Sequence, residues 1–506
     1  VGYIAAHCEA KVAIVEDLGF LERFEKVREQ LPALRRVVLV EDADTVAGQD
    51  QVVSWERLRA AGRDALAAGR DVFEAAWKRA QPEDAATLIY TSGTTGPPKG
   101  VVITHRNALW TAASVERSWP EPIAPGTPYL SYLPLAHSYE RLCGHYACLW
   151  SAQQVHFCPD ILRVMEYLPE VRPVSFVAVP RLWEKAYAGI TAAMAAEPNE
   201  RKRRLVTRAL AVGREAVRLE QAGKPVPAGL KLQRRLFDRL VFSRIRARIG
   251  LDRCRVAVSG AAPIAGEVLE FFLAVGLPMV EGYGLSENTA GATVNPVGRT
   301  RVGTVGLPLP GVEVRLDDDG EILVRGGNVT AGYFKEPEKT AETFDAEGWL
   351  HTGDIGSLDD DGFIRVVDRK KELIVTAGGK NISPANLETL LKRHPLVGQA
   401  CVIGDRRPFL SALVVLDPET APAWAKRHGL PTTRIEDLAA EERVVAEVQR
   451  AVDDVNEHVS QVERVKKFVV LPAEWAVDSE ELTPTLKLKR RVIVEKYAAE
   501  IESLYA

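Results

Sequence analysis

The stretch "LIYTSGTTGPPKGVVITH" (88–105) places an apolar run before a loop that is rich in glycine and hydroxyl side chains. We predict a buried strand that ends at Tyr90, followed by a loop that binds phosphate. Glycines let backbone N–H groups approach an anion closely, while hydroxyls and a lysine add donors and positive charge. The loop is not a Walker A motif, because Lys99 follows Pro98. A plain surface turn is the alternative, which the length of the string disfavours. The predicted phosphate-binding residues are Thr91, Ser92, Gly93, Thr94, Thr95, Gly96 and Lys99.

Around this loop, short apolar runs alternate with amphipathic segments, which predicts an α/β fold with a largely parallel sheet. The runs expected to be buried strands are "RRVVLVED" (35–42), "VSFVAVP" (174–180), "CRVAVSGAAP" (254–263) and "GLPMVEGYG" (276–284). From about residue 302 the pattern changes to a β-hairpin at 311–326 and a second pair of short strands around a charged turn at 362–379. Ser383 and Pro384 predict the start of a helix, and 434–459 a long charged helix.

Length and composition limit the possible classes of protein. A chain of 506 residues is too long for one hydrophobic core, so we expect at least two domains. The net charge of −4 gives no reason to expect a nucleic-acid binder, and no apolar run is long enough to span a bilayer. The six cysteines lack metal-ligand or disulfide spacing, which favours a reducing cytoplasm. We expect no signal peptide, and because the chain starts at Val1 and opens on "AKVAIVED", we expect that sequence is missing before it.

One segment stands out by its charge. Residues 201–255 hold 17 Lys and Arg against 4 Asp and Glu, a local excess of 17 − 4 = 13 positive charges. Solvated helix faces are the simpler interpretation. A patch that meets anionic lipid or a phosphorylated ligand is the alternative, and the pattern alone does not choose between them.

The string "YTSGTTGPPKG" (90–100) resembles the phosphate-binding signature of the acyl-adenylate-forming superfamily, which includes acyl-CoA synthetases, luciferases and peptide-synthetase adenylation domains. Further motifs follow in the family's order across nearly the whole chain. The resemblance implies that ATP and CoA are substrates and that Mg²⁺ is a cofactor.

Three motifs in the first part of the chain receive roles from this resemblance. In "YLPLAHSYER" (132–141) it places His137 near the acyl carboxylate, although a lone histidine is more often structural. The "SYER" continuation is similar to long-chain fatty acyl-CoA synthetases. In "VSGAAPI" (258–264), Gly260, Ala261 and Ala262 would border the adenine. In "VEGYGLSENTAG" (280–291), adenine would stack on Tyr283 between Gly282 and Gly284, Ser286 would donate to the α-phosphate, and Glu287 would hold Mg²⁺.

Two motifs nearer the end complete the set. Residues 347–388 resemble the signature region of fatty acyl-CoA synthetases. By this resemblance Asp354 and Arg369 would bind the ribose, Lys371 would be the hinge, and Gly378 and Gly379 would leave room for the pantetheine arm of CoA. In "LTPTLKLKRR" (482–491), Lys487 matches the lysine that the family uses in adenylation, with Lys489 as the alternative.

These motifs predict a large N-terminal domain of stacked α/β layers (1–368), a hinge (369–371) and a small mobile α+β C-terminal domain (372–506). The predicted enzyme is a cytoplasmic, AMP-forming long-chain fatty acid–CoA ligase, with peripheral contact at the inner face of a membrane through 201–255. One alternative is an acyl-AMP ligase that delivers its product to a carrier protein. Another is a regulatory or scaffold protein that only binds nucleotide, which the joint presence of Glu287, Asp354, Arg369 and Lys487 disfavours.

Overall fold

The computed structural model describes residues 1–42, 51–69, 72–91, 97–375, 381–476, 479–482 and 488–506. The chain forms two compact units: residues 1–108 with 330–343, and residues 109–329 with 344–506. The mixture of helices and sheets confirms the predicted α/β class. The predicted division at 369–371 falls within the second unit and stays a prediction.

The first unit holds a parallel three-stranded sheet and a separate antiparallel hairpin. In the sheet, β2 lies between β1 and β3, and Val15, Val37 and Leu39 pack with helix α2 around a small core. In the hairpin, β4 pairs with β5 on either side of the predicted phosphate loop. The prediction of a buried strand here was wrong for most of β4, because Ile89 is its only buried residue. The elements are α1 (Gly2–His7), β1 (Val12–Val15), α2 (Leu18–Glu25), β2 (Arg36–Leu39), β3 (Val52–Ser54), α3 (Trp55–Ala67), α4 (Val72–Trp77), β4 (Ala85–Thr91), β5 (Lys99–Thr104) and α14 (Pro337–Thr343).

A five-stranded sheet with the order β12-β11-β10-β9-β8 carries the second unit. The prediction of parallel strands is confirmed for β8, β9 and β10, and the two-residue strands β11 and β12, which were not predicted, extend the sheet in antiparallel fashion. Every residue of β8 and β9 is buried, as expected for parallel strands covered on both faces. Trp183 of α9 packs edge-on against Phe176 of β8 and Phe272 of α13. The elements are β8 (Ser175–Ala178), α9 (Pro180–Ala195), α10 (Glu200–Gln221), β9 (Val256–Ser259), α13 (Gly266–Ala274), β10 (Met279–Tyr283), β11 (Thr293–Val294) and β12 (Leu307–Pro308).

An antiparallel four-stranded sheet, β13-β14-β15-β16, follows this core in the sequence. The predicted hairpin at 311–326 is confirmed as β13 (Glu313–Leu316) and β14 (Glu321–Arg325). The two strands expected at 362–379 are both present but belong to different sheets. β16 (Ile364–Arg369) pairs with β15 (Leu350–Leu358), whereas β17 (Ile374–Val375) pairs with β18 (Asn381–Ile382). The backbone N–H groups of Glu372 and Leu373 both bond to the Arg369 carbonyl, which turns the chain between the two sheets.

The last part of the chain wraps helices around both faces of the sheet β19-β20-β21. All seven residues of β20 are buried, and alternate side chains enter two cores: Ala412 and Val414 face α15 and α18, while Leu413 and Val415 face α19 and α20. The predicted helix start is confirmed, since the Ser383 side chain accepts from the Asn386 N–H. The elements are α15 (Pro384–Leu391), β19 (Val397–Ile403), β20 (Leu410–Leu416), α16 (Thr420–Arg427), β21 (Val465–Leu471), α19 (Arg490–Lys496) and α20 (Ala498–Tyr505).

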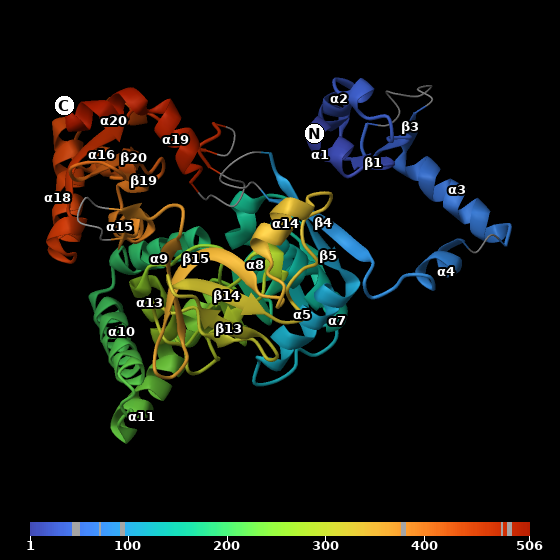
Figure 1. The fold of residues 1–506 in the computed structure, drawn as a ribbon. Coiled ribbons are helices and arrows are strands. Elements are labelled where there is room, and N and C mark those ends of the chain that lie inside the picture. Colours follow the sequence, from blue (N-terminus) through green and yellow to red (C-terminus); the bar gives the residue numbers. More distant parts are fainter. Residues whose placement is uncertain (43–50, 70–71, 92–96, 376–380, 477–478, 483–487) are drawn as a thin grey trace. The chain divides into compact units, whose positions relative to one another are not determined.

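The single helix predicted at 434–459 is instead two helices, α17 (Ile435–Leu438) and α18 (Glu442–Glu457). Glu441 has extended backbone angles and accepts the first hydrogen bonds of α18, so the helical ladder restarts there. The remaining elements are α5 (His105–Arg117), β6 (Pro128–Ser131), α6 (Ser138–Glu140), the π-helix η3 (Arg141–Tyr146), α7 (Ala147–Trp150), β7 (Gln154–Phe157), α8 (Val164–Val171), α11 (Ala228–Phe237), the π-helix η5 (Asp238–Phe242) and α12 (Ser243–Arg248). Figure 1 shows α11 beside the lower end of α10.

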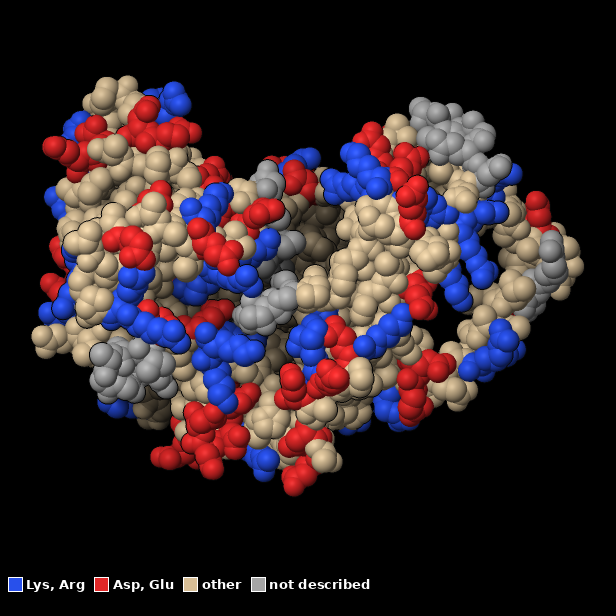
Figure 2. Space-filling model, turned by 45° about the horizontal axis from the view of Figure 1, so that its top comes forward, with Lys and Arg blue, Asp and Glu red and all other residues tan. Residues whose placement is uncertain are grey.

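The surface carries charges of both signs. Figure 2 shows basic and acidic side chains interspersed over the face displayed, in keeping with the net charge of −4. No described helix combines the length and the apolar character needed to cross a bilayer.

Candidate functional site

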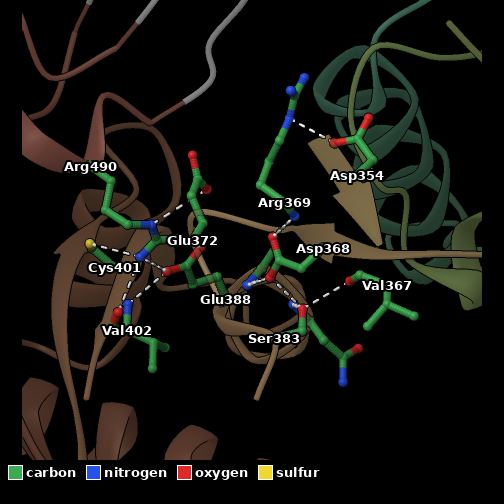
Figure 3. A network of polar contacts seen from close by, with 12 residues as sticks. Asp354, Val367, Asp368, Arg369, Glu372, Ser383, Glu388, Cys401, Val402 and Arg490 are labelled. Atoms are coloured by element: carbon green, nitrogen blue, oxygen red, sulfur yellow. Dashed lines mark hydrogen bonds and ion pairs between the residues drawn. The ribbon is translucent and has the colours of Figure 1, made fainter. Parts of the chain in front are cut away.

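The buried carboxylate of Asp354 joins two other predicted nucleotide-binding residues, Tyr283 and Arg369. Tyr283 ends β10, and its Oη donates to Asp354 Oδ2 at 2.5 Å. Arg369 Nε approaches Asp354 Oδ1 at 2.8 Å, and the two residues face each other in the pairing of β15 with β16 (Figure 3). Only 3% of Asp354 is exposed. Two sequence motifs, 280–291 and 347–388, therefore meet in space at Asp354.

Electrostatics reinforce this cluster. Burial raises the pKa of Tyr283 well above its ordinary range, and the neighbouring Asp354 charge raises it further. Partial burial lowers the pKa of the half-exposed Arg369, but the neighbouring Asp354 charge, followed by Tyr283 and Glu287, outweighs it and raises that pKa. The guanidinium therefore stays charged beside two carboxylates, in a position suited to hydroxyl and phosphate oxygens.

The histidine motif contacts the glycine-tyrosine-glycine motif directly. His137 caps α6, where its Nδ1 accepts from the Tyr139 N–H at 3.2 Å. Ser286 Oγ donates to Ser138 Oγ at 2.9 Å. This hydrogen bond brings Ser286, assigned by resemblance to the α-phosphate, next to the turn that carries His137.

The turn after β9 is crowded at its first residue, Gly260. A Cβ on Gly260 would lie 2.9 Å from Tyr139 Oη. Ala261 adopts a positive φ of 71°, and Ala262 is exposed. A Cβ on Gly284 would lie 2.3 Å from the Ala290 backbone, so the turn after Tyr283 also requires glycine.

The flanks of the predicted phosphate loop lie in the first unit. Thr91 and Lys99 face each other at the end of the β4–β5 hairpin, and Lys99 Nζ lies over the Tyr333 ring, 4.4 Å from its centre. A cation–π contact of this kind holds the ammonium group in place. Ser92, Gly93, Thr94, Thr95 and Gly96 lie outside the described residues, as do Gly378, Gly379 and Lys487.

Metal binding rests on a single candidate. Among the described residues there is no group of three or more His, Cys, Asp or Glu side chains that could hold a metal ion. Glu287 lies in the short helix η6 (Ser286–Asn288) and is half-buried. One carboxylate suits Mg²⁺, which usually binds through one or two carboxylates together with the phosphates of the substrate. The residues present thus fit a metal that arrives with ATP.

The predicted hinge borders two anchored segments. Lys370 pairs with Asp319 and, at 2.9 Å, with Glu321, while the neighbouring Lys371 is exposed. On the preceding strand, Asp368 accepts from Ser383 Oγ at 2.6 Å and from the Ala385 N–H at 3.2 Å (Figure 3). Lys371 therefore sits between fixed neighbours.

Sequence reasoning missed an ion-pair network that follows Lys487 in the chain. Arg490 bonds to both carboxylate oxygens of Glu388 at 2.8 and 2.9 Å, and its Nε lies 3.6 Å from Glu372 (Figure 3). Glu388 is 5% exposed and also accepts from the Val402 N–H. The available signal was the pair Arg490–Arg491, of which only Arg490 faces inward.

Glu140 was also missed, although it lies three residues after His137. It is fully buried, and its Oε1 accepts from Ser131 Oγ at 2.6 Å. Burial raises its pKa to about 7. A Cβ on Gly144 would lie 2.0 Å from this oxygen, so the glycine four residues later was the signal in the sequence.

We predict that Asp354→Asn destabilises the second unit by about 1–2 kcal/mol, because the charged bond to Arg369 is lost while the Tyr283 bond keeps an acceptor. Urea unfolding followed by tryptophan fluorescence measures this. The control is Asp319→Asn, whose pair with Lys370 is half-exposed and should change stability by less than about 1 kcal/mol. Equal losses in both variants would contradict a special role for Asp354.

We predict that Arg490→Ala destabilises the last part of the chain by about 3–5 kcal/mol, because Glu388 is left buried and unpaired. Arg491→Ala is the matched control, since its pair with Glu495 is exposed and contributes about 0–1 kcal/mol. Urea midpoints for the two neighbouring variants should differ clearly, and coincident midpoints would refute the network's importance.

Two family models match this chain. Residues 1–334 match the family model of the AMP-binding enzymes, and residues 371–506 match that of the AMP-binding enzyme C-terminal domain. The long-chain-fatty-acid–CoA ligase FadD15 of Mycobacterium tuberculosis is 38% identical over 508 residues, 100% of this chain and 82% of the relative. The long-chain-fatty-acid–CoA ligase ACSBG2 of Xenopus laevis is 34% identical, over 99% of this chain and 71% of the relative.

Solved structures share the fold. The anthranilate CoA ligase AuaEII in complex with anthranoyl-AMP has a TM-score of 0.68 at 20% identity, over 99% of this chain and 80% of that one. ATP-bound MatB from Rhodopseudomonas palustris has a TM-score of 0.63 at 21% identity, over 98% and 81%. Matched by both family models and by relatives along nearly its whole length, the chain belongs to the AMP-binding enzyme family.

Proposed function

We propose that the protein activates a long-chain fatty acid with ATP as acyl-AMP and transfers the acyl group to CoA, releasing AMP and pyrophosphate. The observation that carries the proposal is the cluster of Tyr283, Asp354 and Arg369, which brings an aromatic ring, a carboxylate and a guanidinium group together. The names of relatives at 34–38% identity support a fatty acid as the acyl donor and CoA as the acceptor.

The proposed roles follow from the charges of the reaction. A carboxylate must approach the α-phosphate of ATP, so catalysis rests on positioning and on stabilising negative charge. Tyr283 would stack on adenine, and Asp354 and Arg369 would hold the ribose. Ser286 and the 91–99 loop would donate to phosphate oxygens, with His137 on the acyl side.

Mg²⁺ would be held by Glu287 together with the phosphates, where it supplies positive charge for the nucleotide. Ser286, the neighbouring residue, would orient the α-phosphate through its hydroxyl. The carboxylate of Glu287 offers oxygen ligands, which a hard cation such as Mg²⁺ prefers.

The two half-reactions need different groups beside the same acyl carbonyl. Lys487 would be needed there during adenylation, and the CoA thiol during thioester formation. We propose that residues 372–506 form the smaller domain and pivot about 369–371, with Lys371 as the hinge and with room for pantetheine at Gly378 and Gly379. Lys371 is exposed, and the pivot would break the bonds that Asp368 accepts from Ser383 and the Ala385 N–H across the proposed hinge.

We further propose a cytoplasmic enzyme that meets the inner face of a membrane peripherally through 201–255. This proposal rests on the 17 basic residues against 4 acidic ones in that segment and on the water-insoluble acyl donor.

The central test is AMP release with ATP, Mg²⁺ and fatty acids of increasing length, with and without CoA. We expect release that depends on CoA and is greatest with long chains, as an acyl-CoA ligase requires. Activity with a phosphopantetheinylated carrier protein but not with CoA would favour the carrier-protein alternative. No AMP with any acid would overturn the proposal.

We predict that Lys487→Ala lowers pyrophosphate exchange by roughly 10²–10³-fold, because one preorganised positive charge is lost from the reacting centre. The same variant should still convert synthetic acyl-AMP and CoA to acyl-CoA. Lys371→Pro should show the opposite pattern, since a fixed φ hinders the pivot. Parallel loss of both half-reactions in Lys487→Ala would exclude its assigned role.

A further inference from the structure

Helix α11 and the segment after it present a row of basic side chains to solvent. Lys231, Arg235, Arg239, Arg244 and Arg248 are all exposed, at steps of four, four, five and four residues. Within the part of the chain that the structure describes, no ion pair involves any of the five. Their charges are therefore available to an external partner.

The step of five falls where the helix changes its geometry. The π-helix η5 spans Asp238–Phe242, and a π-type turn accommodates one extra residue. A five-residue step there rotates the chain about as far as a four-residue step in an α-helix. The π-turn thus keeps Arg244 and Arg248 of α12 near the row that begins on α11.

A second row, of leucines, runs next to the first. Leu232, Leu236 and Leu240 each follow a member of the basic row by one residue and are 69%, 55% and 40% exposed. Their exposure is not a sign of poor packing, because Phe237, Val241 and Phe242 of the same segment are buried in the main core. The outward leucines form an apolar stripe of a folded surface helix.

Other arginines of the same helices have structural roles, which sets the outer row apart. Arg234 donates to Glu220 of α10 and to the Leu273 carbonyl of α13. Arg246 donates to Asp238 and to the Val275 carbonyl. These inward arginines fix α11 and α12 to the body of the unit, so the leucine and basic rows are held on a rigid support.

We propose that the basic row and the leucine row of α11, η5 and α12 form a docking surface for an anionic lipid bilayer. The leucines would enter the interface between headgroups and acyl chains, and the basic side chains would meet the lipid phosphates. An acidic protein or a nucleic acid would also be attracted by the basic row. An apolar stripe beside cations matches a bilayer better, because the bilayer offers lipid phosphates to the cations and acyl chains to the leucines. This inference rests on the proposed function in one respect: docking would give the enzyme access to fatty acid that is dissolved in the membrane.

Vesicle flotation of the full chain, without ATP or CoA, tests the surface. One set of vesicles holds equal parts of phosphatidylcholine and phosphatidylglycerol, and the other holds phosphatidylcholine alone. We expect flotation with the anionic vesicles, weakened by salt. Lys231→Gln with Arg235→Gln should weaken it roughly 10- to 30-fold, and Leu232→Ser with Leu236→Ser should weaken it by a similar factor. The matched control, Val462→Ser with Lys466→Gln, removes an exposed apolar and a basic residue elsewhere and should float like the wild type.

Activity measurements separate this inference from the proposed function. All variants should release AMP normally from detergent-dispersed fatty acid, and the two α11 variants should be slower with vesicle-embedded acid. If no protein releases AMP in either format, the proposed function fails while the flotation result stands. Equal flotation with neutral vesicles, wild-type flotation by the α11 variants, or no flotation at all would overturn the docking surface. If the wild type is instead an oligomer that does not float, and the α11 variants are monomers, the face is a contact between copies of this chain.

Discussion

The buried carboxylate of Asp354 is the constraint on which the site depends. It accepts a hydrogen bond from Tyr283, the last residue of β10 in the five-stranded sheet. It also pairs with Arg369, the last residue of β16 in the four-stranded antiparallel sheet. A carboxylate that is 3% exposed is tolerated only when charged and hydrogen-bonded partners surround it. The pairing therefore fixes β10 relative to β15 and β16, and it holds Arg369 at the point where the chain leaves the sheet.

A comparable constraint acts on the far side of the proposed hinge. Glu388 of α15 is buried and pairs with Arg490, whose Nε also lies 3.6 Å from Glu372 (Figure 3). The segment that follows Lys371 and the helix that follows Lys487 are thus fixed to each other. If the hinge proposal holds, both would move as one body, because breaking a buried ion pair costs several kcal/mol. The exposed Lys371 lies between this body and the Asp354 cluster.

The outer helices show how the same residue type serves two purposes. Arg234 and Arg246 hold α11 and α12 to the core. The five members of the basic row face solvent instead: Lys231, Arg235, Arg239, Arg244 and Arg248. A charge excess counted along the sequence does not distinguish these groups. The π-turn at Asp238–Phe242 aligns the outer row, and both Phe237 and Phe242 are buried in the main core beside it.

What the sequence determined by itself is local. Glycine spacing, the Ser383 cap, the 311–326 hairpin and the apolar runs of β8 to β10 depend on neighbouring residues, and all were predictable. Tertiary structure alone decided the antiparallel β11 and β12, the separate sheets of β16 and β17, and the break before α18. It also decided which polar side chains became partners, since Tyr283 and Asp354 are 71 residues apart and Arg490 and Glu388 are 102 apart. Such pairs form because a buried polar or charged group needs a hydrogen-bonding partner. Which residue becomes that partner depends on strand register and helix packing across the whole chain.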